Sequence, residues 1–231
     1  MKHTVSTNAG LWWQGDVQIT AGHSILEGLL AVPENAGGLV IFAHGSGSSR
    51  HSERNQSVAA TLQREGLATL LFDLLTLEEE HLDARMNHLR FDIEFLAGRL
   101  RAASAWAARQ EQTMGLRTGF FGASTGAAAA LLAASTDENI SAVVCRGGRP
   151  DLAGDTVLQR VEVPTLLIVG GDDEPVIPLN EHALAHLRCT KRLEIIPGAS
   201  HLFEEPGALD AVAALAAGWF DTYLPVQGWS P

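Results

Sequence analysis

A serine in a short glycine-flanked motif could supply a nucleophile. Residues 122–126 read Gly-Ala-Ser-Thr-Gly and match the pattern G-x-S-x-G, between an apolar run and an alanine-rich stretch. A serine on a sharp strand-to-helix turn holds its hydroxyl clear of a sheet, and the small residues around it let the strand and the helix approach each other. Ser124 is therefore the predicted nucleophile. The backbone N–H of Thr125, at the helix N-terminus, is placed to stabilise an oxyanion.

A histidine and a group of acids follow this serine in an order that suits acyl transfer. Asp172, Asp173 and Glu174 come directly after an apolar run, and His201 lies between the last predicted strand and the last predicted helix. Histidine can accept and return a proton at neutral pH, and a carboxylate holds its ring in the right tautomer. The pattern predicts His201 as the general base and one of the three acids as its partner. The other acids are expected to cap the following helix.

A glycine-rich loop could complete such a site. Residues 44–50 read His-Gly-Ser-Gly-Ser-Ser-Arg and follow an apolar strand. Backbone N–H groups in such a loop can turn toward an oxygen that develops negative charge, and Ser46 is the predicted donor, with Gly47 as the neighbouring alternative. His44 is expected to support the loop. A dinucleotide-binding loop is the other interpretation, but Arg50 stands where G-x-G-x-x-G needs its third glycine.

The elements that must position these residues alternate along the chain. From about residue 39 onward, short apolar runs alternate with longer helical patterns, which is typical of an α/β fold on a mostly parallel sheet with helices on both faces. The expected strands cover residues 38–43, 68–73, 118–121, 141–145, 164–169 and 192–196. The expected helices cover residues 53–65, 88–112, 125–134, 179–187 and 208–223. Residues 1–37 are expected to add a hairpin, with strands at 16–20 and 24–32, to one antiparallel edge.

Length and composition limit the class of protein. The 231 residues suit one domain over residues 1–231 rather than two. The formal net charge of −11 argues against a nucleic-acid partner, because neutralising phosphates needs clustered Lys and Arg. No segment approaches the roughly 18 apolar residues of a membrane span, and the N-terminus has no signal-peptide pattern. We therefore expect a cytoplasmic protein with no membrane partner. A homo-oligomer is compatible with the sequence.

Neither the cysteines nor the remaining histidines predict a metal site. Cys145 and Cys189 lack metal-ligand spacing and are expected to be buried, inert thiols. His182 and His186 are four residues apart on a predicted helix and share a face, but no carboxylate is spaced to complete a site as in H-E-x-x-H. The sequence predicts no metal. No cofactor is implied, because a serine and water supply the chemistry.

Little of the chain is left to form a lid. Only residues 146–163 separate the strand predicted at 141–145 from the strand predicted at 164–169, so we expect no large cap and an open site for a small substrate. Arg146 and Arg149 leave a strand at the edge where ligands bind in open α/β sheets. They are candidates for holding a substrate carboxylate, with pairing to nearby acids such as Asp151 as the alternative. Residues 75–87 are a polar, acidic excursion expected as a solvated loop, with one wall of the site as the alternative.

These motifs together resemble the α/β-hydrolase superfamily. The narrower resemblance is to its small dienelactone-hydrolase-like branch, including hydrolase domains fused to phosphoribosyltransferases in bacteria. It runs from residue 38 to the final helix and rests on residues 44–50, 121–128, 170–177 and 198–203. It implies an α/β-hydrolase fold.

The resemblance also implies a role for each candidate residue. Ser124 would be the nucleophile, Asp173 the orienting acid and His201 the base, with backbone donors from Ser46 and Thr125. Dienelactone hydrolases use a cysteine nucleophile, whereas the corresponding position here is Ser124. General ester hydrolysis is therefore a safer expectation than lactone specificity.

Three functions fit this set of residues. The expected one is a serine hydrolase that cleaves carboxylic esters of small molecules through an acyl-enzyme. The same triad could act on amides, peptides or thioesters, which only substrate tests separate. A noncatalytic ligand-binding protein is the third, and it has no need of a nucleophile, acid, base and oxyanion loop in this order.

Overall fold

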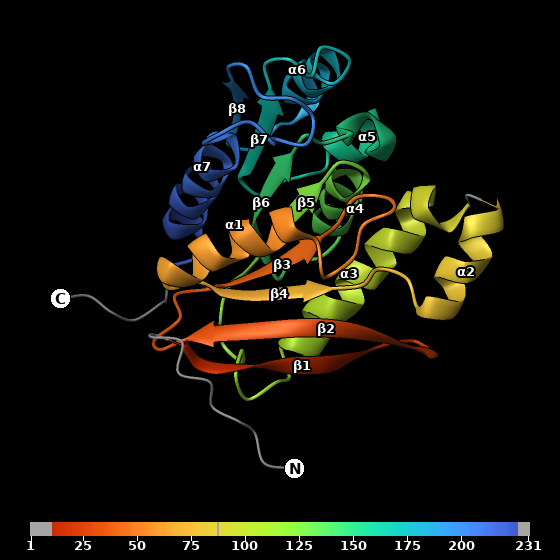
Figure 1. The fold of residues 1–231 in the computed structure, drawn as a ribbon, viewed down its shortest axis with the longest axis vertical. Helices are drawn as coiled ribbons and strands as arrows, with labels where there is room; N and C mark the ends of the chain where they lie inside the picture. The colour runs from red at the N-terminus through yellow and green to blue at the C-terminus, as the bar shows by residue number, and fades with distance from the viewer. Residues whose placement is uncertain (1–10, 87, 226–231) are drawn as a thin grey trace.

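One mostly parallel sheet forms the centre of the computed structural model, which describes residues 11–86 and 88–225 (Figure 1). Its eight strands lie in the order β1-β2-β4-β3-β5-β6-β7-β8. The strands are β1 (Leu11–Ala21), β2 (Ser24–Pro33), β3 (Leu39–Ala43), β4 (Ala68–Phe72), β5 (Thr118–Ala123), β6 (Ile140–Arg146), β7 (Thr165–Gly170) and β8 (Lys191–Ile196). From β4 to β8 every neighbouring pair is parallel, so the carboxyl ends of these strands share one edge.

The parallel strands follow from continuous apolar runs. Every residue of β3, β4, β5 and β7 is buried, as a strand covered on both faces requires. The predicted bounds of these strands agree with the structure to within two residues at each end. The predicted α/β fold class is confirmed.

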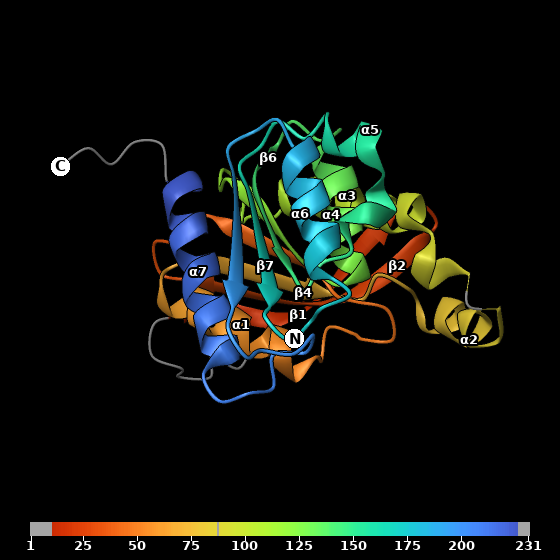
Figure 2. The same ribbon diagram turned by 90° about the horizontal axis from the view of Figure 1, so that it is seen from above.

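Helices cover both faces of the sheet (Figure 2). On one face lie α1 (Glu53–Arg64) and α7 (Ala208–Tyr223), and on the other lie α3 (Ile93–Ala107), α4 (Thr125–Ala134) and α6 (Ile177–His186). Each face has its own apolar cluster, formed where the helices pack on the strands. Among the described helices, none combines the length and the apolar character needed to cross a membrane.

The hairpin of β1 and β2 forms the antiparallel edge. β1 and β2 pair through a turn at Gly22, whose φ of 64° is left-handed and suits a residue without a side chain. β2 then pairs antiparallel with β4. The observed β1 is longer than the predicted strand, residues 16–20. Residues 1–10 of the expected N-terminal segment lie outside the described part of the chain.

The long helix predicted over residues 88–112 is wrong at both ends. A short 3-10 helix, η1 (Leu89–Phe91), comes first, and α3 begins only at Ile93. The Asp92 side chain accepts the N–H of Phe95 at 3.0 Å and so caps the start of α3. At the other end, the hydroxyl of Thr113 donates to the carbonyl of Ala107, which closes the last turn.

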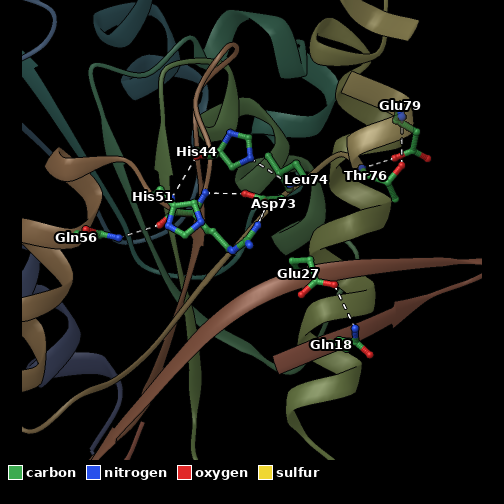
Figure 3. A network of polar contacts seen from close by, with 11 residues as sticks. Gln18, Glu27, His44, His51, Gln56, Asp73, Leu74, Thr76 and Glu79 are labelled. Atoms are coloured by element: carbon green, nitrogen blue, oxygen red, sulfur yellow. Dashed lines mark hydrogen bonds and ion pairs between the residues drawn. The ribbon is translucent and has the colours of Figure 1, made fainter. Parts of the chain in front are cut away.

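The solvated loop expected over residues 75–87 is also wrong, because the chain forms α2 (Leu77–Met86) there. The N–H of Glu79 donates to the Thr76 hydroxyl at 3.2 Å, and the N–H of Thr76 donates to the Glu79 carboxylate at 2.8 Å (Figure 3). This reciprocal pair is a capping box, with the sequence signature T-x-x-E. Thr76 and Glu79 therefore fix where α2 starts.

The interval between β6 and β7 holds only short elements. These are a 3-10 helix, η2 (Pro150–Ala153), and α5 (Asp155–Leu158). The described residues form no large cap at this position, as the sequence predicts. α2 lies on the opposite side of the molecule from α7 (Figures 1 and 2).

Candidate active site

Ser124 stands at the turn from β5 into α4 in a strained backbone conformation. Its φ is 51° and its ψ is −120°. A positive φ in a non-glycine residue costs on the order of 1–3 kcal/mol and persists only where surrounding contacts enforce it. Here the N–H of Ser124 donates to the carbonyl of Arg146 at 3.2 Å, and the N–H of Arg149 donates to the carbonyl of Ser124 at 3.0 Å. The end of β6 therefore holds the serine turn.

The two glycines of the motif are needed for close packing. A Cβ atom on Gly122 would lie 2.5 Å from the Cα of Ala127, and one on Gly126 would lie 2.3 Å from the carbonyl oxygen of Ala43. Both distances are far below van der Waals contact. Glycine at these positions lets β5, α4 and the end of β3 meet around the serine.

His201 and Asp173 are brought together from two loops at the same edge of the sheet. The Nδ1 atom of His201 lies 2.7 Å from Oδ2 of Asp173, and the Asp173 residue is only 7% exposed. The N–H of Asp172 donates to the carbonyl of Ala199 at 3.0 Å, which ties the two loops together. A carboxylate can only accept, so Nδ1 carries the proton and Nε2 is left with a lone pair that can act as a base.

The histidine loop reaches the serine turn through Gly147. A Cβ atom on Gly147 would lie 3.4 Å from Nδ1 of His201, and Gly147 directly follows Arg146, whose carbonyl accepts the Ser124 N–H. Within residues 11–86 and 88–225, no hydrogen bond joins the Ser124 hydroxyl to the His201 ring. Such contacts are often long in a free enzyme and shorten when substrate binds.

Glu205 is a residue of this region that the sequence did not point out. Its carboxylate accepts the N–H of Ser200 at 3.0 Å, and this bond holds the pKa of Glu205 below its usual value. Phe203, between them, is buried and has a φ of 57°. Glu205 therefore fixes the loop that carries His201. No short motif could have identified it, because an acid four residues after a histidine is common in surface loops.

The predicted oxyanion loop lies against the serine. A Cβ atom on Gly45 would lie 3.1 Å from the Cβ of Ser124. The N–H of Ser46 donates to the hydroxyl of Thr125 at 2.9 Å. The structure therefore brings the two predicted donor residues together, but the N–H of Ser46 is already used in this bond. The N–H of Thr125 belongs to the first turn of α4 and has no acceptor within the helix.

His44 links this loop to the end of β4 (Figure 3). The N–H of Leu74 donates to Nε2 of His44 at 3.1 Å, and Nδ1 lies 2.9 Å from the carbonyl of Gly45. The ring is therefore neutral, with its proton on Nδ1. Burial lowers the pKa of His44, which is consistent with this state. The N–H of Arg50 donates to Asp73 at 2.7 Å and adds a second link to β4.

A cavity of about 470 Å³ opens beside the predicted oxyanion donors. The loop after β3 forms one wall, and Glu80, Asp83 and Arg90 from the α2 and η1 region form another. Asp83 and Arg90 are joined by an ion pair. Burial and the nearby Asp73 raise the pKa of Glu80. The cavity therefore has both polar and apolar walls, and residues 75–87 supply part of a wall, which is the alternative that the sequence left open for them.

The two arginines after β6 have different surroundings. Arg149 forms two hydrogen bonds to the carboxylate of Asp151, at 2.8 and 2.7 Å, which is the alternative that the sequence left open. Arg146 is buried, and its Nε and Nη1 atoms have no hydrogen-bond partner within the described residues. Its guanidinium carbon lies 5.9 Å from the ring centroid of Phe203. Arg146 therefore has two buried donors without a partner in the described part of the chain, whereas Arg149 uses its Nε and Nη2 atoms on Asp151. Neither arginine lines the cavity.

A family profile and two relatives match most of the chain. The profile described as an alpha/beta hydrolase domain matches residues 36–214. Two strains of Mycobacterium tuberculosis each have a protein provisionally named a phosphoribosyl transferase that is 55% identical over 210 residues. The match covers 90% of this chain but 46% of each relative, so the chain spans about half the length of the curated relatives it matches.

Solved structures share the fold. A structure called a dienelactone hydrolase from Anabaena variabilis is 58% identical with a TM-score of 0.89, and the match covers 92% of this chain and 98% of that one. Est1E from Butyrivibrio proteoclasticus is 16% identical with a TM-score of 0.73, covering 89% of this chain and 99% of that one. The latter likeness shows the fold alone. The profile and the Anabaena structure together place the chain in the α/β-hydrolase family, in its dienelactone-hydrolase-like branch.

Proposed function

We propose that this protein is a serine hydrolase that cleaves carboxylic esters of small molecules. The observation that carries the proposal is the 2.7 Å contact between His201 and Asp173 at the sheet edge where Ser124 is held in a strained turn. A buried carboxylate on Nδ1 leaves Nε2 of His201 as a base, and a serine nucleophile needs a base to take its proton. Membership of a hydrolase family supports the same reading.

The proposed reaction proceeds through an acyl-enzyme. The Ser124 hydroxyl attacks the ester carbonyl carbon while Nε2 of His201 takes its proton, and Asp173 stabilises the imidazolium. The N–H of Thr125 and a loop N–H stabilise the tetrahedral oxyanion. The loop donor is Gly47, the alternative to Ser46, because the N–H of Ser46 is paired with the Thr125 hydroxyl. Collapse breaks the bond to the alcohol, which leaves with the proton from His201. Water then gives a proton to His201 and attacks the acyl carbon, and the acid leaves as Ser124 regains its proton. No cofactor or metal has a part in this scheme.

The cavity beside the oxyanion donors suggests the size of the substrate. A volume of about 470 Å³ admits a small molecule, and Ser48, Ser49 and Glu80 offer partners for its polar groups beside three leucines that also line the cavity. We propose that a substrate carboxylate would meet Arg146 rather than Arg149. Nε and Nη2 of Arg149 are used by Asp151, whereas Nε and Nη1 of Arg146 have no partner within the described residues.

The phosphoribosyl transferase name of the Mycobacterium relatives needs its own explanation. The match covers 46% of each relative, and the hydrolase profile matches the same part of this chain. We propose that this half of the relatives is their hydrolase part and that the transferase name describes the remainder. No phosphoribosyl transfer is proposed for the present chain.

The test is hydrolysis of a short-chain p-nitrophenyl ester by the purified protein, with covalent labelling by a fluorophosphonate alongside. Wild type is expected to turn over and to be labelled, and Ser124→Ala to do neither while folding normally. Ser57→Ala, on the exposed face of α1, is the matched control and should behave as wild type. A p-nitroanilide of the same acid would separate ester from amide preference. A folded wild-type protein that neither turns over nor labels would overturn the proposal and favour a ligand-binding role.

A further inference from the structure

Three metal-ligating side chains from α5 and α6 lie close together, outside the candidate active site. The two helices are neighbours in Figure 1. Asp155 begins α5, and His182 and His186 lie on α6. Each offers one ligand atom, and these atoms all lie within 4.8 Å of one another. The sequence predicted no metal here because no carboxylate is spaced near the histidines. The fold supplies one from 27 residues earlier in the chain.

Helix geometry sets the two histidines side by side. Residues four apart share a face of an α-helix, and the rings of His182 and His186 stack with 4.1 Å between their centroids. Buried Ala183, on α6, and buried Leu158, on α5, belong to one apolar cluster, so the two helices are held in place. Asp155 then faces the histidine pair without any rearrangement of the fold.

The hydrogen bonds orient both rings toward the carboxylate. Nε2 of His182 lies 2.8 Å from Oδ1 of Asp155, and Nε2 of His186 lies 3.7 Å from Oδ2. Nδ1 of His186 lies 2.8 Å from the carbonyl of His182. Because a carbonyl only accepts, Nδ1 carries the proton in the neutral ring, and Nε2 of His186 keeps its lone pair. Such a backbone contact is the usual way in which a ligating histidine is fixed.

We propose that Asp155, His182 and His186 form a binding site for a divalent transition metal such as Zn²⁺. Bond lengths of about 2.0–2.2 Å put the ligand atoms of a tetrahedral zinc site about 3.4 Å apart. The three ligand atoms here lie within 4.8 Å of one another, so small side-chain rotations would bring them onto one ion. The ion replaces the proton that His182 shares with Asp155. All three side chains are partly exposed, at 57%, 48% and 30% in chain order, so water can complete the coordination. Imidazole and carboxylate ligands also suit Cu²⁺ and Ni²⁺.

A metal at this position would connect α5 to α6. The two helices flank β7 in the chain, and the loop with Asp173 directly precedes α6. An ion bound by the folded chain raises its stability in proportion to the logarithm of the metal concentration over Kd. The expected readout is therefore thermal stability and stoichiometry, independent of any hydrolase activity.

The test uses the full chain without a histidine tag, stripped with a chelator and titrated with ZnCl₂ by calorimetry. We expect one Zn²⁺ per chain, and a rise in Tm of about 5 °C at a hundredfold excess over Kd. His186→Gln and Asp155→Asn should each weaken binding by at least about tenfold. His23→Gln, at the exposed turn between β1 and β2, is the matched control and should bind as wild type.

A second measurement reads the geometry directly. Co²⁺ in place of Zn²⁺ should give the intense visible absorption of a tetrahedral site in wild type and in His23→Gln, and lose it in His186→Gln. Melting the stripped variants without metal checks that each folds. Absence of one-to-one binding by wild type, or equal affinity in Asp155→Asn, His186→Gln and wild type, would overturn the proposal.

Discussion

The backbone N–H of Ser46 donates a hydrogen bond to the hydroxyl of Thr125, with 2.9 Å between the two atoms. The bond joins residues 79 positions apart and anchors the loop after β3 to the first turn of α4. Gly47, with a φ of 72°, makes no backbone hydrogen bond through its own N–H within the described residues. The hydroxyl of Thr125 therefore acts as a positioning group for the loop that is proposed to supply an oxyanion donor.

Thr125→Val tests this role. Valine keeps the shape of threonine but removes the acceptor, so the Ser46 N–H loses its partner and the loop its anchor. A hydrogen bond of this kind contributes about 1 kcal/mol, and we expect kcat for a p-nitrophenyl ester to fall about five- to tenfold with little change in KM. Thr125→Ser keeps the hydroxyl and should restore most of the rate. An increase in kcat in Thr125→Val would mean instead that the hydroxyl competes with the substrate oxygen.

Asp173 and Asp172 offer a paired test of the orienting acid. Asp173 is buried against His201, whereas the neighbouring Asp172 is exposed. An amide at position 173 can donate to Nδ1 and so favour the wrong histidine tautomer, a change that costs about 10⁴ in rate in serine hydrolases. We expect kcat/KM of Asp173→Asn to fall by about that factor and that of Asp172→Asn to stay close to wild type. Similar losses of kcat/KM in the two variants would show that Asp173 is not the specific partner of His201.

Sequence patterns predicted the parts of this protein that depend on local chemistry. The segments Leu39–Ala43 and Thr165–Gly170 are mostly apolar, and every residue in them is buried. A nearly continuous apolar run is what a strand covered on both faces requires. The turn at Ser124 needs glycine two positions to either side, which leaves a mark in the sequence. These features were predictable because each is encoded within a few consecutive residues.

The remaining features could not be predicted, for different reasons. The capping box of Thr76 and Glu79 was present in the sequence, but the acidic composition of α2 hid it behind the expectation of a loop. The approach of Asp155 to His182 leaves no local mark, because it arises from the packing of α5 on α6. The path of the chain at the end of β6 decides which acids the arginines can reach. Arg149 pairs with Asp151, and Arg146 is left with unpaired Nε and Nη1 atoms among the described residues.

His44 predicts a pH dependence of stability. Burial lowers the pKa of His44 below the value of 6.5 for an exposed histidine, so over a range below pH 6.5 the unfolded chain binds a proton that the folded protein does not. The stability present above pH 6.5 should therefore be lost as the pH falls toward the lowered pKa. Protonation would also break the bond from the Leu74 N–H to Nε2.

His44→Gln separates this contribution from that of other groups. Glutamine can place an acceptor near the Leu74 N–H but cannot take up a proton. Urea denaturation at about pH 8 and about pH 5.5 should show a smaller loss of stability on acidification in His44→Gln than in wild type. His23→Gln, at the exposed hairpin turn, should lose as much as wild type. Equal losses in His44→Gln and wild type would show that His44 does not drive the dependence.

Arg146 is a buried, charged residue that forms no ion pair with an acid within residues 11–86 and 88–225. Burial, together with the nearby charge of Arg54, lowers the pKa of Arg146 to about 10, which still leaves it protonated at neutral pH. Its Nε and Nη1 atoms are unpaired among the described residues, and a buried donor without a partner costs about 1–3 kcal/mol. Such a cost is characteristic of residues kept for binding rather than for stability.

Arg146→Met should therefore separate stability from activity. Methionine fills a similar volume without a charge, so we expect the free energy of unfolding to rise by about 1–2 kcal/mol, measured by urea denaturation. If Arg146 meets a substrate carboxylate, the same change should lower kcat/KM for an ester that bears a carboxylate on its acyl group, and leave a neutral ester of equal length almost unchanged. Arg149→Met instead breaks an ion pair with Asp151. It should not raise the free energy of unfolding, and it should leave the ratio of kcat/KM for the two esters as in wild type. A less stable Arg146→Met with no change in the ratio of the two esters would make Arg146 a structural residue.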